Sequence, residues 1–255
     1  MSRRRALGLL VLFILLNLVR GLLYAALVPP WQAPDEPKHF EYVRLLYEKR
    51  RSVGWSDIDP SLEEEIIQSM DRYEYWRFGR FNQIGKSFKE LWGGASHKLE
   101  QPPLSYLLYA SLLPLIPPAE PAFQLYSFRL VSVFLGTLVV LLAFLTAREL
   151  FPHDEVMQIG IPTFVTFLPM HTFVTSSLNS DHLAEVLVSL ALFLLVRVFR
   201  HGLSLYSLAG IGIAVFSAAL AKRTALFMVP TLLAAIPLYL VGRGRLISWG
   251  KALLL

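Results

Sequence analysis

Two adjacent carboxylates and a histidine stand where the first long apolar run of the chain ends. Residues 29–39 read Pro-Pro-Trp-Gln-Ala-Pro-Asp-Glu-Pro-Lys-His, which places Asp35, Glu36 and His39 in one short segment. The prolines fix the backbone and prevent a helix before Asp35, after which a helical pattern begins. A carboxylate held in this way can act as a general base, and the histidine beside it can bind a polar substrate.

Further polar residues interrupt or border the later apolar runs, and under the topology below they reach the same side as Asp35. The most unusual are Lys222 and Arg223, because two cations on an external turn oppose the usual positive-inside bias. They require an anion, and a lipid phosphate is the natural one, since arginine binds it bidentately. The other candidates for substrate or phosphate contacts are Arg129, His97, Gln101, Asp181 and Glu185.

Simpler interpretations exist for several of these residues. Asp35 and Asp181 each precede or open a helical pattern, so either could serve only as a helix cap. Arg129 could extend along the apolar surface to reach the membrane interface. Glu185 is harder to explain in this way, because an acid at the edge of an apolar span is costly and normally lines a cavity.

The composition indicates a membrane protein. Of the 255 residues, 55% are hydrophobic and concentrated in long runs, and the mean hydropathy is +0.50. The net charge of +5 comes from basic residues dispersed between apolar runs, which does not indicate a nucleic-acid partner. Cysteine is absent, which excludes disulfides and thiolate zinc sites.

The apolar runs predict an all-α, polytopic membrane domain over residues 1–255. An external loop over 29–122 is expected to carry surface helices at 36–50 and 103–116, the first of them amphipathic. The last five residues resemble the start of a further span, which indicates a truncated chain. The six predicted spans cover 6–28, 123–147, 156–176, 182–200, 203–221 and 225–241.

The basic residues predict the orientation. Arg3, Arg4 and Arg5 precede the first span, so the N-terminus is expected in the cytoplasm and the Asp35 segment outside. Keeping the run at 103–116 outside the membrane also places the later arginine clusters in the cytoplasm. These are Arg148, Arg197, Arg200, Arg243 and Arg245.

The landmarks in this order resemble the C-type membrane glycosyltransferases, the superfamily of the protein O-mannosyltransferases and aminoarabinose transferases. The resemblance is to the bacterial branch with a Pro-Asp-Glu-x-x-His motif in its first loop, here ending at His39. It extends to Glu-Gln-Pro-Pro-Leu at 100–104, to Arg129, to Asn-Ser-Asp at 179–181 and to Ala-Lys-Arg at 221–223. Members usually carry more spans than the six predicted here.

The resemblance implies an inverting glycosyltransferase of the plasma membrane, with its active site on the outer face. The donor would be a polyprenyl-phosphate sugar, and the acceptor a glycan, a lipid or a protein. Asp35, with Glu36 beside it, would act as the base, and cations would hold the phosphate. A divalent cation, Mg²⁺ or Mn²⁺, is a candidate cofactor at Asp35 and Asp181. The alternative is a polytopic transporter or lipid flippase without transferase activity.

Overall fold

The protein is all-helical wherever the structure describes it. The computed structural model describes residues 2–78, 98–117 and 119–242, and contains no strand among them, which confirms the all-α part of the predicted fold class. Its α-helices are α1 (Arg3–Leu27), α2 (Glu36–Lys49), α3 (Pro60–Arg72), α5 (Leu104–Ala110), α6 (Pro121–Leu150), α7 (Glu155–Phe167), α8 (Pro169–Thr175), α9 (Asp181–His201), α10 (Leu205–Ala221) and α11 (Met228–Gly242).

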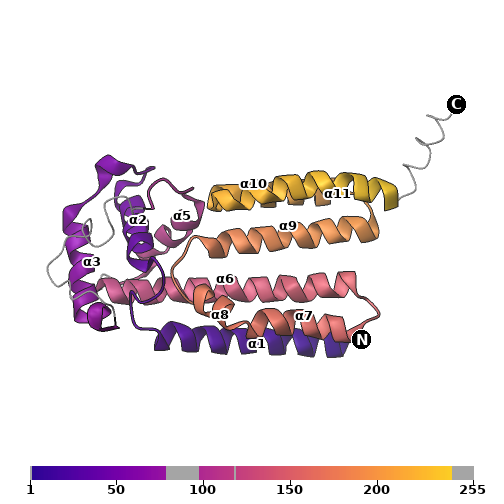
Figure 1. The fold of residues 1–255 in the computed structure, drawn as a ribbon, viewed down its shortest axis with the longest axis horizontal. Helices are drawn as coiled ribbons and strands as arrows, with labels where there is room; N and C mark the ends of the chain where they lie inside the picture. The colour runs from indigo at the N-terminus through magenta and orange to yellow at the C-terminus, as the bar shows by residue number, and fades with distance from the viewer. Residues whose placement is uncertain (1, 79–97, 118, 243–255) are drawn as a thin grey trace.

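The long helices lie side by side, and a smaller helical group covers one end of them (Figure 1). That group consists of α2, α3 and α5, and the N-terminus lies at the opposite end of the long helices (Figure 1). We call the covered end the capped end and the other the open end. The loop between α8 and α9 and the turn between α10 and α11 both lie at the capped end (Figure 1).

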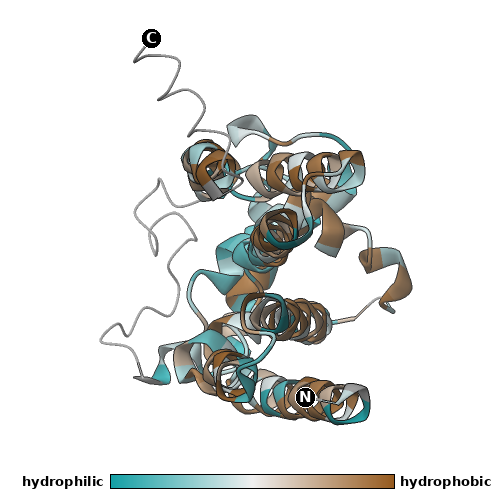
Figure 2. Ribbon diagram, turned by 90° about the vertical axis from the view of Figure 1, so that its right-hand side faces the viewer, coloured by the Kyte–Doolittle hydropathy of each residue, from teal (hydrophilic) through white to brown (hydrophobic). Residues whose placement is uncertain are grey.

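Among the residues that the structure describes, four helical stretches are long and apolar enough to cross a membrane: Arg4–Leu27, Pro121–Leu150, Asp181–His201 and Arg223–Val241. The apolar helix α10 has 17 residues and is shorter than these four. Seen along their axes, the long helices are predominantly hydrophobic (Figure 2), and many of their large apolar side chains are exposed, among them Leu15, Phe134 and Phe216. A bundle that is apolar on its outside fits a lipid environment.

The predicted span at 156–176 forms two helices instead of one. Helix α7 ends before Leu168, and α8 begins at Pro169, which has no backbone N–H to continue the hydrogen-bond ladder. The guanidinium of Arg20 in α1 donates to the carbonyl of Thr166, one of those left free by the break. A second polar contact joins α1 and α6, where Asn17 Nδ2 donates to Thr137 Oγ1 at 3.0 Å. Such contacts satisfy polar groups that lipid cannot.

The helix predicted at 36–50 exists, but it does not lie on the surface. Ten of its residues, from Glu36 to Leu46 with the exception of Arg44, are buried. Its apolar side chains belong to a core shared with α3, α5 and α6, in which Trp31, Phe40 and Phe128 are fully buried. The predicted surface helix at 103–116 is the short helix α5 followed by a 3₁₀ turn at Leu113–Leu115.

Candidate functional site

A buried ion pair fixes the segment that contains Asp35. The guanidinium of Arg129 in α6 donates from Nε to Glu36 Oε1 at 2.8 Å and from Nη2 to Glu36 Oε2 at 2.6 Å. Both side chains are fully buried. Glu36 Oε1 also accepts from the backbone N–H of Leu178, in the loop before α9, at 3.1 Å. One carboxylate therefore joins α6, the start of α2 and the loop that leads into α9.

Arg129 also closes the C-terminal end of α1. It donates to the carbonyls of Ala25, Val28 and Pro29 at 2.6 to 3.0 Å. The last carbonyls of a helix have no partner within the helix, so an arginine donor satisfies them. The structure thus gives Arg129 and Glu36 a positioning role. The sequence had led us to expect that Arg129 contacts the phosphate and that Glu36 acts beside the base. Because both side chains are buried, neither is placed to contact a phosphate or an acceptor.

Asp35 is held apart from this pair and is open to solvent. Its backbone lies in the left-handed region (φ 59°), which is uncommon for a residue other than glycine. Its carboxylate forms no helix cap. Instead it accepts from Lys98 Nζ at 2.9 Å and lies 3.2 Å from Lys38 Nζ. The side chain is 42% exposed, so a substrate could reach it.

The lysines determine the charge of Asp35. Burial raises the pKa of the Asp35 carboxyl, but the hydrogen bond and charge of Lys98, together with Lys38, outweigh it. The pKa therefore lies below its usual value, and Asp35 is a carboxylate at neutral pH. Such a group accepts a proton only late in a reaction, when the attacking hydroxyl has become acidic.

The second acid of the site also has a lysine partner. Asp181, the first residue of α9, forms an ion pair with Lys222, which follows α10. Burial lowers the pKa of Lys222, and so does the charge of Lys98, whereas Asp35 opposes this effect. The two acid–lysine pairs are therefore close enough to influence each other.

A pocket of about 290 Å³ opens beside these pairs. Arg223 is exposed at its rim and is held by a 2.7 Å hydrogen bond from Nη2 to the carbonyl of Glu100. Gln101 lines the same pocket. The predicted phosphate-binding pair Lys222–Arg223 and the predicted contact residue Gln101 thus come together, although more than 100 positions separate them in the chain. The pocket is lined by Glu100, Gln101, Pro102, Lys222, Arg223 and Thr224.

His39 supports the pocket from inside the fold. Its Nδ1 lies 2.9 Å from the hydroxyl of Tyr106, which donates to Gln101 Oε1 at 3.1 Å. Ser180 Oγ donates to the same oxygen at 3.2 Å. Burial is the main reason that the pKa of His39 falls to about 3, so the ring is neutral. His39 orients Gln101 through Tyr106 and is itself 2% exposed.

Two residues missed by the sequence analysis complete the site. Lys98 is the closest partner of Asp35. Ser105, fully buried, donates to the carbonyl of Ser180 at 2.8 Å and lies 3.4 Å from that of Ala221, which ties α5 to the ends of α9 and α10. The available clue was their position close to the Gln-Pro-Pro sequence at 101–103, which Lys98 precedes and Ser105 follows.

One predicted contact residue, Glu185, is not part of this arrangement. Glu185 faces α8, where its Oε1 lies 2.9 Å from His171 Nε2. Both residues line a mostly apolar pocket of about 350 Å³ among α6, α7, α8 and α9, away from the capped-end pocket. His97 lies outside the described residues.

The residues present do not fit a divalent cation. Lys98 and Lys222 already neutralise Asp35 and Asp181, and an ammonium group competes for the oxygens that a cation would need. Within residues 2–78, 98–117 and 119–242, no three histidine or acidic side chains come together as metal ligands. We therefore assign no step to a metal.

Comparisons of the chain with protein-family models, with curated proteins and with solved structures found no match. The function is therefore inferred from the capped-end residues themselves.

Proposed function

We propose that the chain is a membrane glycosyltransferase that uses a polyprenyl-phosphate sugar as donor. The observation that carries this proposal is a solvent-accessible carboxylate, Asp35, grouped with Lys98, Lys222 and Arg223 at the end of apolar helices. Transfer from a lipid phosphate needs a base for the acceptor and cations for the leaving group. It also needs both at a membrane surface, where the headgroup of such a donor lies.

The proposed reaction is a single displacement. The acceptor hydroxyl forms a bond to the anomeric carbon of the sugar, and the bond from that carbon to the phosphate oxygen breaks. The bonding electrons leave with the polyprenyl phosphate, whose growing negative charge Lys222 and Arg223 stabilise. The hydroxyl proton passes to Asp35 as positive charge develops on the sugar, as in other glycosyl transfers. Attack opposite the leaving group inverts the anomeric configuration.

The topology belongs to the same proposal. We place the protein in the plasma membrane with its N-terminus in the cytoplasm, the capped end outside, and six passes that include α10 and the broken α7–α8 pair. The arginines at the open end support this orientation, since positive residues favour the cytoplasm. The acceptor is a glycan, a lipid or a protein reached from outside.

A comparison of surface glycans by mass spectrometry tests the proposal. Deletion of the gene should remove a defined sugar from a surface component, and the intact gene should restore it. An unchanged glycan profile, together with loss of uptake or export of a solute or lipid, would contradict transfer. It would favour a transporter or flippase, for which the discontinuous α7–α8 pair is the supporting observation.

A further inference from the structure

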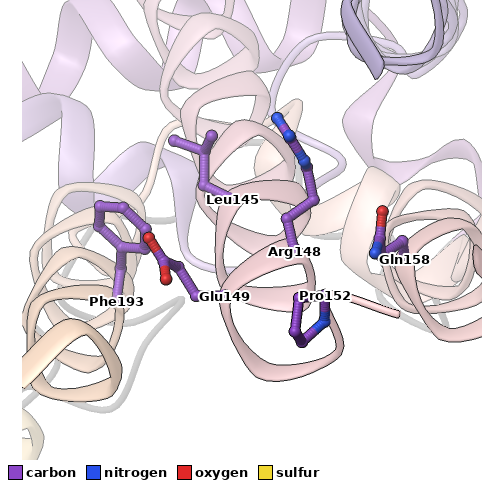
Figure 3. Close-up of a pocket in the computed structure, with 6 residues that line it drawn as sticks. All are labelled: Leu145, Arg148, Glu149, Pro152, Gln158 and Phe193. Atoms are coloured by element: carbon purple, nitrogen blue, oxygen red, sulfur yellow. The ribbon is translucent and has the colours of Figure 1, made fainter. Parts of the chain in front are cut away.

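A further pocket lies at the open end of the bundle and belongs to none of the chemistry above. Its volume is about 310 Å³, and its walls come from α6, α7, α9 and the turn after α6. It combines three apolar side chains with an arginine, an acid and an amide. They are Leu145, Arg148, Glu149, Pro152, Gln158 and Phe193 (Figure 3).

The acid of this pocket is already neutralised. Glu149 Oε2 lies 2.9 Å from His201 Nε2, and Oε1 lies 3.5 Å from Arg197 Nε. Figure 3 shows Glu149 turned toward Phe193, whereas Arg148 extends away from both. Glu149 therefore does not compensate the charge of Arg148.

Arg148 keeps its charge available. In the part of the chain that the structure describes, its guanidinium has no ion-pair or hydrogen-bond partner, and its nearest aromatic contact is the Phe144 ring at 5.8 Å. The amide of Gln158, 2% exposed, is fixed by a hydrogen bond from Nε2 to the carbonyl of Phe151 at 2.6 Å. The pocket is thus a preformed hollow with one uncompensated cation.

We propose that this pocket binds the phosphate of an anionic membrane phospholipid through Arg148. Arg148 lies two residues before the end of a 30-residue apolar helix, which places it at the depth of lipid headgroups. A guanidinium binds phosphate oxygens bidentately, and Leu145 and Phe193 offer an apolar wall for the start of an acyl chain. The occupant that matches both features is a phospholipid with a net negative headgroup.

The test uses the full chain in nanodiscs that contain phosphatidylglycerol and phosphatidylcholine, with retained lipids counted by native mass spectrometry. The wild type should retain phosphatidylglycerol selectively. Arg148→Gln should weaken this retention roughly tenfold, the scale of a lost charge-assisted contact. Arg148→Lys should fall between the two. The matched control is Arg200→Gln, an exposed arginine at the same end but outside the pocket, and it should behave as wild type.

Thermal unfolding provides the second readout. Added phosphatidylglycerol should raise the Tm of the wild type and of Arg200→Gln but not that of Arg148→Gln, whose side chain is exposed and whose loss leaves the fold intact. Equal loss in both variants would reduce the effect to diffuse surface attraction and overturn the proposal. Unchanged retention in Arg148→Gln, or displacement of the lipid by millimolar inorganic phosphate, would also overturn it. These outcomes are independent of glycosyl transfer, which is assigned to the other end.

Discussion

At the scale of single residues, Asp35 is distinguished from its neighbour by what each carboxylate contacts. Both carboxylate oxygens of Glu36 accept hydrogen bonds inside the fold, from Arg129 and from the backbone N–H of Leu178. Among the described residues, the Asp35 carboxylate contacts the ammonium groups of Lys38 and Lys98, and it stays accessible to solvent. Because adjacent residues point in different directions at the start of α2, one acid supports the fold and the other is exposed to solvent, where the proposed reaction would use it.

Arg223 should affect donor binding and transfer together. Arg223→Ala should weaken polyprenyl-phosphate binding and slow transfer further, because negative charge on the phosphate grows during the reaction. Arg223→Lys should restore only part of the affinity, since an ammonium cannot form the bidentate contact. The control is Arg72→Ala, which removes an exposed arginine that pairs with Glu120 and does not line the pocket. Unchanged donor affinity in correctly inserted Arg223→Ala would remove this residue from the site.

The burial of His39 should make the stability of the fold depend on pH. Burial lowers its pKa from 6.5 to about 3, so between these values the unfolded chain binds a proton that the folded protein excludes. Stability therefore falls as the pH drops from 6.5 toward 3, by about 2 kcal/mol at pH 5. His39→Asn keeps a donor near Tyr106 but does not titrate.

Unfolding in detergent at pH 7 and pH 5 measures this difference. His39→Asn should lose less stability between the two pH values than the wild type does. The control His153→Asn, at an exposed position, should lose as much as the wild type. The same acid sensitivity in wild type and His39→Asn would show that another group is responsible.

At the scale of elements, the Glu36–Arg129 pair joins three parts of the fold, namely the start of α2, α6 and the loop before α9. Glu36→Gln should destabilise the protein by about 3–5 kcal/mol, because it leaves a buried guanidinium without its counter-charge. The double variant Glu36→Leu/Arg129→Met should be less destabilised than Glu36→Gln, since no charge remains buried. Chemical unfolding measures both. A loss below about 1 kcal/mol in Glu36→Gln would show that the pair does not hold this end together.

The elements also show what a sequence reveals and what it does not. The start of α2 at Glu36 followed from the prolines and Asp35, which act locally. The burial of α2 did not follow, because α3, α5 and α6 cover it from distant parts of the chain. Likewise, no spacing rule could pair Glu36 with Arg129, 93 positions away. Arg20, a charge inside an apolar run, was the available clue to the break before Pro169.

At the scale of the whole molecule, the arrangement of the helices places Asp35, Asp181 and Lys222 at one end and Arg148, with the open-end pocket, at the other. The order of apolar runs and basic residues anticipated this separation. It did not anticipate which polar side chains would pair, because that depends on packing around α5 and on Ser105 in particular.

The orientation can be measured directly because the chain has no cysteine. A single cysteine at exposed Ser52, in the capped end, should react with a membrane-impermeant thiol reagent in intact cells. A cysteine at exposed His153, at the open end, should react only after the cells are permeabilised. Labelling of position 153 from outside would reverse the proposed orientation.

The most direct test of the account is the rate of sugar transfer by purified Asp35→Asn. Asparagine preserves the size of the side chain and tolerates the left-handed backbone, but it cannot take up the proton of the acceptor. We expect correctly inserted protein with transfer reduced by roughly 100-fold or more, the scale of a lost general base. Asp57→Asn, on a carboxylate of the same end that pairs with Arg51 and does not line the pocket, should transfer at the wild-type rate. Wild-type turnover in Asp35→Asn would contradict the account.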